Sequence, residues 1–175
     1  LAAGAKALSY WWYTPFGEYY GCGGSDPAMR AWWKEVGLLG AEIRSTEPLL
    51  IRSSPARIDL QGPQTLWMRS LLAGDDAMVL IIVNDNFASD RLGTVIRPVQ
   101  KARVTAQVPG WLTIQDVFEV TPEGTRDVAW KMDTRELALD LGTVEVTRFV
   151  IASRDAALRE QVQRLYDENC HANVQ

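Results

Sequence analysis

Apolar residues recur in short, strand-length runs through the last two-thirds of the chain. Large apolar residues alternate cleanly in two of the runs, one through Leu137, Leu139 and Leu141 and the other through Val128, Trp130 and Met132. Such alternation is typical of strands with one face on a core and the other in water. The sequence predicts strands at 66–73, 77–84, 102–108, 111–120, 126–132, 135–141 and 143–152, with a tight connection at 74–76 between the first two.

About eight short strands with no helix between them favour an antiparallel β-sandwich, which we place at residues 48–154. The segment before the first of these strands, 46–64, is expected to be a linker. A change of parity between Val146 and Phe149 predicts a β-bulge near Thr147. Three tryptophans are expected in the sandwich core rather than on an exposed binding platform: Trp67, Trp111 and Trp130.

A helix is expected on each side of the sandwich. The first begins with Asp26 as N-cap and Pro27 in the first turn, and ends before Glu47. Its apolar face repeats at spacings of three and four, with both tryptophans expected in the core: Met29, Trp32, Trp33, Val36, Leu39 and Ile43. The second helix runs from about 155 to 169 and is capped by Asp155, with an apolar stripe of Leu158, Val162, Leu165 and Tyr166.

The first part of the chain has a different pattern. Residues 4–13 predict a short strand buried on both faces, since the segment is apolar apart from Lys6 and Ser9. A glycine-rich loop then leads to the first helix. Strand, loop and helix form half of a βαβ unit, and a parallel strand needs neighbours. The chain therefore combines an incomplete α/β unit of one strand and one helix with a mainly β domain.

Charge and composition narrow the choice of partners. The formal net charge is −4 and there is no basic stripe, so neither nucleic acid nor an anionic membrane is an expected partner. Cys22 and Cys170 lie far apart and form no zinc spacing, and whether they are bonded stays open. The one histidine, His171, lies beside Cys170 near the C-terminus. No metal and no cofactor is expected.

Seven aromatic residues fall between positions 10 and 20, and Glu18 is the one acid among them. Burial of one such ring removes roughly 150–250 Å² from solvent. The cluster is either the end of a core that continues outside this chain or a stacking surface for a flat ligand such as a sugar. Its members are Tyr10, Trp11, Trp12, Tyr13, Phe16, Tyr19 and Tyr20.

The order of these segments resembles the C-terminal part of (β/α)₈-barrel glycoside hydrolases, particularly the β-galactosidase-like groups. The stretch G-A-K-A-L-S-Y-W-W-Y-T-P at 4–15 resembles the eighth barrel strand. The stretch G-L-L-G-A-E-I-R-S-T-E-P-L-L at 37–50 resembles the end of the closing helix and its exit to a β-sandwich. The run from Leu66 to Asn86 is similar to the opening hairpin of such sandwiches. The resemblance divides the chain into a barrel remnant at 1–47, the sandwich at 48–154 and a terminal helix and tail at 155–175.

The resemblance implies a place in carbohydrate chemistry without the catalytic groups. In these enzymes the eighth strand commonly ends in an aromatic residue that stacks under the sugar. Trp11 and Tyr13 share one strand face, and they are expected to bind substrate together with Glu18 and Tyr19. The two carboxylates that cleave the glycosidic bond come from strands four and seven, which this chain lacks, so no catalytic residue is assigned. The expected partners are an oligo- or polysaccharide and the rest of the barrel, and the chain alone should be inactive.

Two other classes of function stay open at this stage. One is a stand-alone carbohydrate-binding sandwich, which would use Trp67 or Trp130 as its platform. The other is a structural, immunoglobulin-like module that docks onto a protein partner. The polar segment 84–86, with Asp90, could hold calcium through oxygen ligands, but its spacing fits no EF-hand, so a hairpin turn is the favoured interpretation.

Overall fold

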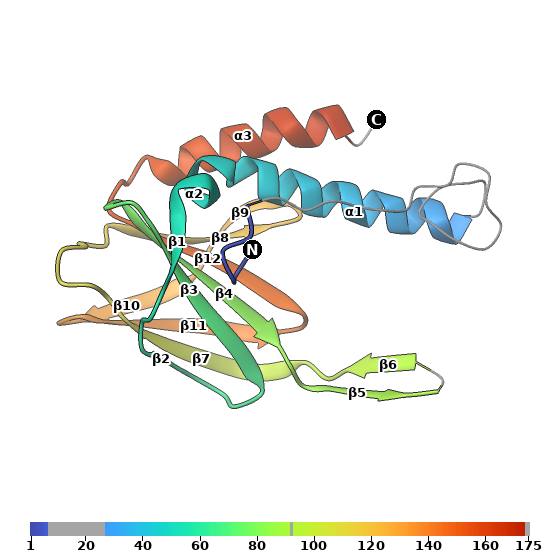
Figure 1. The fold of residues 1–175 in the computed structure, drawn as a ribbon, viewed down its shortest axis with the longest axis horizontal. Coiled ribbons are helices and arrows are strands. Elements are labelled where there is room, and N and C mark those ends of the chain that lie inside the picture. Colours follow the sequence, from blue (N-terminus) through green and yellow to red (C-terminus); the bar gives the residue numbers. More distant parts are fainter. Residues whose placement is uncertain (7–26, 92, 174–175) are drawn as a thin grey trace.

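The chain folds into two facing antiparallel sheets and a separate two-stranded hairpin (Figure 1). The computed structural model describes residues 1–6, 27–91 and 93–173. The strands are β1 (Ser53–Ala56), β2 (Leu60–Gln61), β3 (Leu66–Ala73), β4 (Ala77–Asn84), β5 (Phe87–Asp90), β6 (Gly93–Ile96), β7 (Val99–Gln107), β8 (Asp116–Thr121), β9 (Gly124–Asp127), β10 (Ala129–Asp133), β11 (Glu136–Val144) and β12 (Thr147–Ser153). A six-stranded sheet has the order β1-β3-β4-β12-β8-β9, and a four-stranded sheet has the order β10-β11-β7-β2. The expected mainly β fold with an antiparallel sandwich is confirmed.

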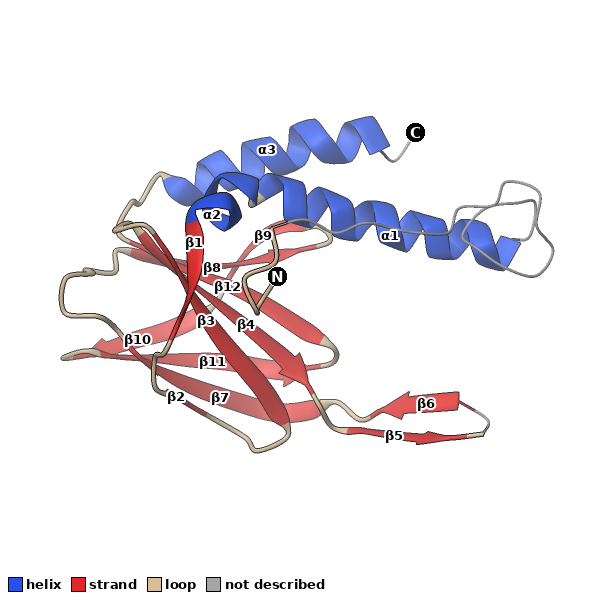
Figure 2. Ribbon diagram, in the orientation of Figure 1, coloured by secondary structure: helices blue, strands red, loops and turns tan. Residues whose placement is uncertain are grey.

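Three helices lie on the outer side of the six-stranded sheet (Figure 2), and two of them and the C-terminal end of the first pack on it, so the molecule has a helical layer, a central sheet and an outer sheet. They are α1 (Pro27–Ser45), α2 (Glu47–Arg52) and α3 (Leu158–Asn173). The C-terminal helix was expected, and Asp155 caps it as expected: its carboxylate accepts the N–H of Ala157 at 2.9 Å. No helix in the described part of the chain is long and apolar enough to cross a membrane.

The first core lies between the two sheets and follows from strand alternation. On β11, Leu137, Leu139 and Leu141 point inward and are buried, as their spacing predicts. Their cross-strand partners on β7 include Ala106 and Val104. Trp130 packs against this core, as expected.

The second core lies between the central sheet and the helices, and it explains the unbroken apolar run of β4. Met78, Leu80 and Ile82 face the first core, whereas Val79 and Ile81 face the helical layer. Both faces of the strand are therefore covered, and both parities are apolar. The helices contribute Leu49 and Leu50 from α2 and Leu158 and Val162 from α3.

Several local expectations are corrected by the structure. The segment expected to be a linker, 46–64, contains α2, β1 and β2. β12 pairs with β4 in unbroken register from Thr147, and a bend at Glu145–Val146 accounts for the parity change, so the bulge near Thr147 is wrong. The register shifts lie instead in β11, at Asp140, Gly142 and Val144.

The expected sandwich tryptophans separate into two groups. Trp130 packs against the core, but Trp67 and Trp111 are exposed. The strand expected at 111–120 begins only at Asp116, which leaves Trp111 in the preceding turn. The expectation that these two residues lie in the core is therefore wrong.

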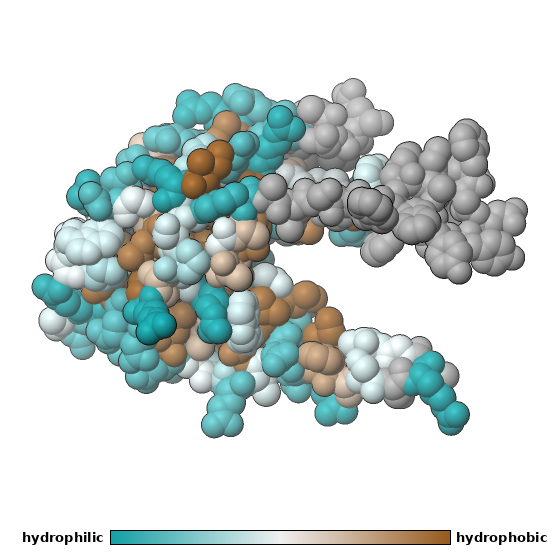
Figure 3. Space-filling view, in the orientation of Figure 1, coloured by the Kyte–Doolittle hydropathy of each residue, from teal (hydrophilic) through white to brown (hydrophobic). Residues whose placement is uncertain are grey.

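The hairpin of β5 and β6 projects away from the sandwich as an arm (Figure 1), and the sequence patterns did not predict it. Its junction with β4 is built around Asn84, which is buried. The Asn84 side-chain amide donates to the carbonyls of Glu145 at 2.8 Å and Arg97 at 3.0 Å, and its oxygen accepts the N–H of Asn86 at 2.8 Å. Residues 84–86 are thus the base of an arm, where a hairpin turn was expected. Figure 3 shows apolar surface where the arm leaves the sandwich.

The expected barrel strand lies mostly outside the described residues. Residues 1–6 form a turn and an extended segment with no strand, and the N–H of Gly4 donates to the Leu1 carbonyl at 2.7 Å. The Lys6 ammonium donates to the carbonyl of Leu50 at 2.7 Å and to that of Ser53, at the C-terminal end of α2. A cation suits the last carbonyls of a helix.

Candidate functional site

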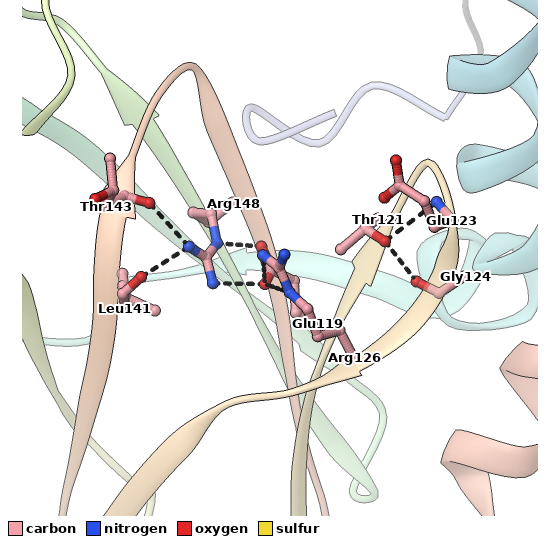
Figure 4. Close-up of polar contacts among 8 residues, drawn as sticks. All are labelled: Glu119, Thr121, Glu123, Gly124, Arg126, Leu141, Thr143 and Arg148. Atoms are coloured by element: carbon pink, nitrogen blue, oxygen red, sulfur yellow. Dashed lines mark hydrogen bonds and ion pairs between the residues drawn. The ribbon is translucent and has the colours of Figure 1, made fainter.

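A polar pocket of about 650 Å³ opens at one end of the sandwich. We call this the hairpin end, because it carries the β8–β9 turn, the β11–β12 turn and the β5–β6 arm. The polar lining groups used below come from α1, from β8 and β9, and from β12: Glu42, Glu119, Thr121, Glu123, Arg126 and Arg148. Figure 4 shows the contacts among most of them.

The centre of the pocket is an ion-pair network around Glu119. The Glu119 side chain is 2% exposed, so its charge needs close partners. The Arg148 guanidinium binds it with two parallel contacts, Nε to Oε1 and Nη2 to Oε2, the second at 2.6 Å. Arg126 adds Nη2 to Oε2 at 2.7 Å. Two-point pairing of this kind is the strongest arrangement that arginine makes with a carboxylate.

Arg148 also joins the two sheets. Its Nη1 donates to the carbonyls of Leu141, at 2.8 Å, and Thr143, at 3.1 Å, both on β11 of the opposite sheet (Figure 4). Glu119 and Arg148 occupy inward positions of β8 and β12, between apolar inward neighbours such as Val117 and Val150. The network therefore closes the end of the sandwich with charge where the rest of the interior uses apolar packing.

The β8–β9 turn is held from two sides. Thr121 Oγ1 donates to the Gly124 carbonyl at 3.0 Å and accepts the N–H of Glu123 at 3.2 Å (Figure 4). On the other side, Gln163 of α3 accepts the N–H of Thr125 at 2.7 Å. Gly124 has φ +111°, which favours glycine, and a Cβ there would lie 2.7 Å from the end of the Gln163 side chain and would have to displace it. These contacts fix Glu123 at the rim of the pocket.

Glu42 faces this turn from α1. Burial raises its pKa to about 7, and the nearby charges of Glu123 and Glu119 add to the effect. A pKa near 7 brings the change of protonation of the Glu42 carboxyl group close to neutral pH.

The pocket combines hydrogen-bond donors and acceptors with one acid that is fully engaged in ion pairs. Glu119 is committed to two arginines, so it is poorly placed to act as the second acid or base beside Glu42. The half-exposed Arg126 offers donors, and Glu42 and Glu123 offer acceptors. Across the described residues, no group of three or more His, Cys, Asp or Glu side chains could hold a metal ion.

The residues expected to bind substrate lie outside the described part of the chain: Trp11, Tyr13, Glu18 and Tyr19. Their roles stay predictions. Trp67, the other aromatic candidate, has Arg69 over its ring at 4.7 Å, so one of its faces is already occupied by a guanidinium.

Sequence reasoning missed the Glu119 network, although a signal was present. Glu119 stands inside the apolar run V-F-E-V, and Arg148 stands just before F-V-I-A. A charged residue within a buried strand is rarely left without a partner of opposite charge. The pattern could have predicted that each residue was paired, but not that they paired with each other, since they are 29 positions apart.

No protein-family model matches the sequence, and no curated protein matches it either. Among solved structures, the chain is similar to a cycloisomaltooligosaccharide glucanotransferase from Paenibacillus sp. in complex with cycloisomaltoheptaose. The identity is 17%, the TM-score is 0.51, and the match covers 66% of this chain and 20% of that one. It is also similar to α-L-fucosidase isoenzyme 2 from Paenibacillus thiaminolyticus, with 12% identity, a TM-score of 0.44, and coverage of 56% and 15%.

Both neighbours are carbohydrate-active enzymes, and the chain spans a fifth or less of their length. At this identity the match to the glucanotransferase supports the fold, a β-sandwich of the kind found in such enzymes.

Proposed function

We propose that this chain is the C-terminal portion of a glycoside hydrolase, and that it contributes an accessory sandwich and sugar-stacking aromatic residues without the catalytic carboxylates. In this proposal residues 1–47 complete the catalytic barrel, 48–154 form the accessory domain, and 155–175 pack on it. Trp11, Tyr13, Glu18 and Tyr19 line the sugar site of the assembled enzyme.

The observation that carries the proposal is the apolar face of α1. Within residues 27–40, no side chain that the structure describes is buried. Leu39 is 43% exposed, although the helical period of the sequence makes it part of an apolar stripe, and Trp33 on the same stripe is 41% exposed while it still takes part in an interaction within the chain. The expectation that Trp33 lies in the core of this chain is wrong. An amphipathic helix gains most of its stability by packing that face, which a barrel would allow.

The fold likeness supports the same proposal. The matched part of this chain corresponds to 20% of the glucanotransferase chain, so a sandwich of this kind occurs as a minor part of a much larger carbohydrate-active enzyme. Glu119, the most deeply buried acid of the pocket, is neutralised by arginines and serves structure. In the proposed enzyme, hydrolysis depends on a pair of carboxylates contributed by strands outside this chain.

The test is to express the complete gene product from its own start codon and assay it against a panel of aryl glycosides and oligosaccharides. We expect hydrolysis by the complete product and none by residues 1–175 alone. Trp11→Ala and Tyr13→Ala should raise KM or lower kcat by roughly fivefold, since stacking on one ring is worth about 1 kcal/mol. Trp111→Ala is the matched control. Hydrolysis by the 175-residue chain alone, or an upstream sequence without a barrel, would refute the proposal.

A further inference from the structure

The large exposed apolar side chains of the described residues are concentrated around the hairpin end. Phe87, Val95 and Ile96 lie on the β5–β6 arm, and Val146 lies in the β11–β12 turn. The Val146 carbonyl accepts the N–H of Asn84 at 2.8 Å, which places this turn against the base of the arm. Grouped apolar exposure of this kind marks an interaction surface.

The arm is anchored at its base but is not packed against the sandwich along its length. Its base is held by the hydrogen bonds of Asn84 and by the N–H of Arg97, which donates to the Asn86 carbonyl at 2.8 Å. Beyond the base, the strands pair mainly with each other, and Ser89 and Thr94 share a hydrogen bond of 2.8 Å. An isolated two-stranded hairpin is marginal in water, so an arm with exposed Phe87 and Ile96 needs a body to pack on.

Helix α1, on which Leu39 is exposed, extends toward the same side of the molecule as the arm (Figure 1). Two apolar projections of different kinds, one helix and one hairpin, thus flank the hairpin end. One large body seated at this end could cover both of them.

We propose that the β5–β6 arm docks onto the catalytic barrel of the same polypeptide through the face that carries Phe87 and Ile96. The inference rests on the proposed function, which supplies the barrel. Phe87 and Ile96 are direct cross-strand partners, so their side chains share one face of the arm. The other face has Ala88 paired with Val95 and offers less apolar surface.

A second copy of the chain is the less favoured occupant on grounds of charge. The rim between the two projections carries Glu123 and Glu145, and of the two arginines that line the pocket only Arg126 is half exposed. A two-fold symmetric contact uses the same surface on both copies, so it would bring these acidic rims together.

The test uses hydrogen exchange of the complete gene product, followed by mass spectrometry. In the wild-type protein we expect the amides of β5 and β6 to exchange at least about a hundredfold more slowly than unstructured peptide. Phe87→Ser/Ile96→Ser should accelerate that exchange at least about tenfold. Trp111→Ser is the matched control, because Trp111 is 48% exposed against 55% for Phe87 and lies before β8, at the opposite end of the sheet.

The outcomes separate the two proposals. If the gene product contains an active barrel and the arm still exchanges like unstructured peptide, the docking inference is overturned and the proposed function stands. If protection rises with protein concentration and sedimentation shows a dimer that the double substitution dissociates, the occupant is a second copy and the inference is wrong. If the product has no barrel, the proposed function is refuted, and the docking inference that rests on it is overturned as well. Slow exchange that the double substitution abolishes, in a monomer with an active barrel, supports the inference.

Discussion

The two ends of the central sheet carry the same kind of ion-pair cluster in different surroundings. At the hairpin end, Glu119 is buried and Arg148 is 13% exposed. At the other end, Arg159 of α3 binds Asp116 through Nη2 at 2.7 Å and also binds Asp127, with side-chain exposures of 29%, 21% and 88%. The second cluster is more open to screening by water, whereas Glu119 and Arg148 of the first are largely shielded from it. The difference teaches that burial, more than the number of contacts, decides what an ion pair does for stability.

Loss of the buried acid should have the largest effect. Glu119→Ala leaves Arg148 buried without its counter-charge, and breaking a buried pair in this way costs about 3–5 kcal/mol. Urea unfolding of the purified chain measures this loss of stability. The double variant Glu119→Ala/Arg148→Met should recover much of the loss, because both charges are removed. A double variant no more stable than the single one would contradict this account of the hairpin end.

Glu42→Gln should have the next largest effect, and its sign should depend on pH. The folded-state pKa of Glu42 is raised from 4.5 to about 7, so the folded state holds the proton more tightly than the unfolded state does. Stability of the wild-type chain therefore falls as pH rises from about 4.5 to about 7.

The Gln side chain is neutral at every pH, so the variant lacks this fall in stability between pH 4.5 and about 7. At pH 8 the variant should exceed the wild type by about 1–2 kcal/mol, after allowance for the partial exposure of the carboxyl. Thermal unfolding of both proteins at pH 5 and pH 8 checks it. The difference should be small at pH 5, and an equal difference at both values would argue against titration of Glu42. Glu35→Gln, at an exposed position of the same helix, is the matched control.

Asp116→Asn should have a smaller effect, of about 1 kcal/mol, because the Arg159 cluster is partly solvated. The pKa of Arg159 is lowered by burial but raised overall by its hydrogen bonds and charges from Asp127 and Asp116, so this arginine stays charged at all working pH values. The effect should shrink in 0.5 M salt, whereas that of Glu119→Ala should not. Equal salt dependence of the two substitutions would show that burial does not distinguish the two ion-pair clusters.

Arg126→Gln should have the smallest effect, below about 1 kcal/mol, although Arg126 contacts the same buried acid as Arg148. Its side chain is 55% exposed, and Glu119 keeps both contacts from Arg148 after the change. Parallel urea unfolding of Arg126→Gln and Arg148→Gln tests this, and comparable losses would show that exposure does not separate the two arginines.

Where an apolar run adjoins a turn sequence, the first and last residues of the strands could be predicted. The apolar run 77–84 and the turn at 74–76 mark β3 and β4, since Gly74 with φ +59° supplies the chain reversal and the flanking residues supply the core. The β5–β6 arm carried no such signal, because periodicity reports burial against a core and the arm has none within the described residues.

By itself the sequence determined the sandwich class, the two long helices, the strands with strong local signals and the parity of most core positions, because these depend on neighbours within a few residues. Only the tertiary structure decided that β4 is covered on both faces, that Glu119 meets Arg148, and that Glu42 lies among acids with a pKa near neutral. Each of these depends on which distant segments meet and on how much water is excluded where they meet. Both are properties of the assembled layers that no local pattern encodes.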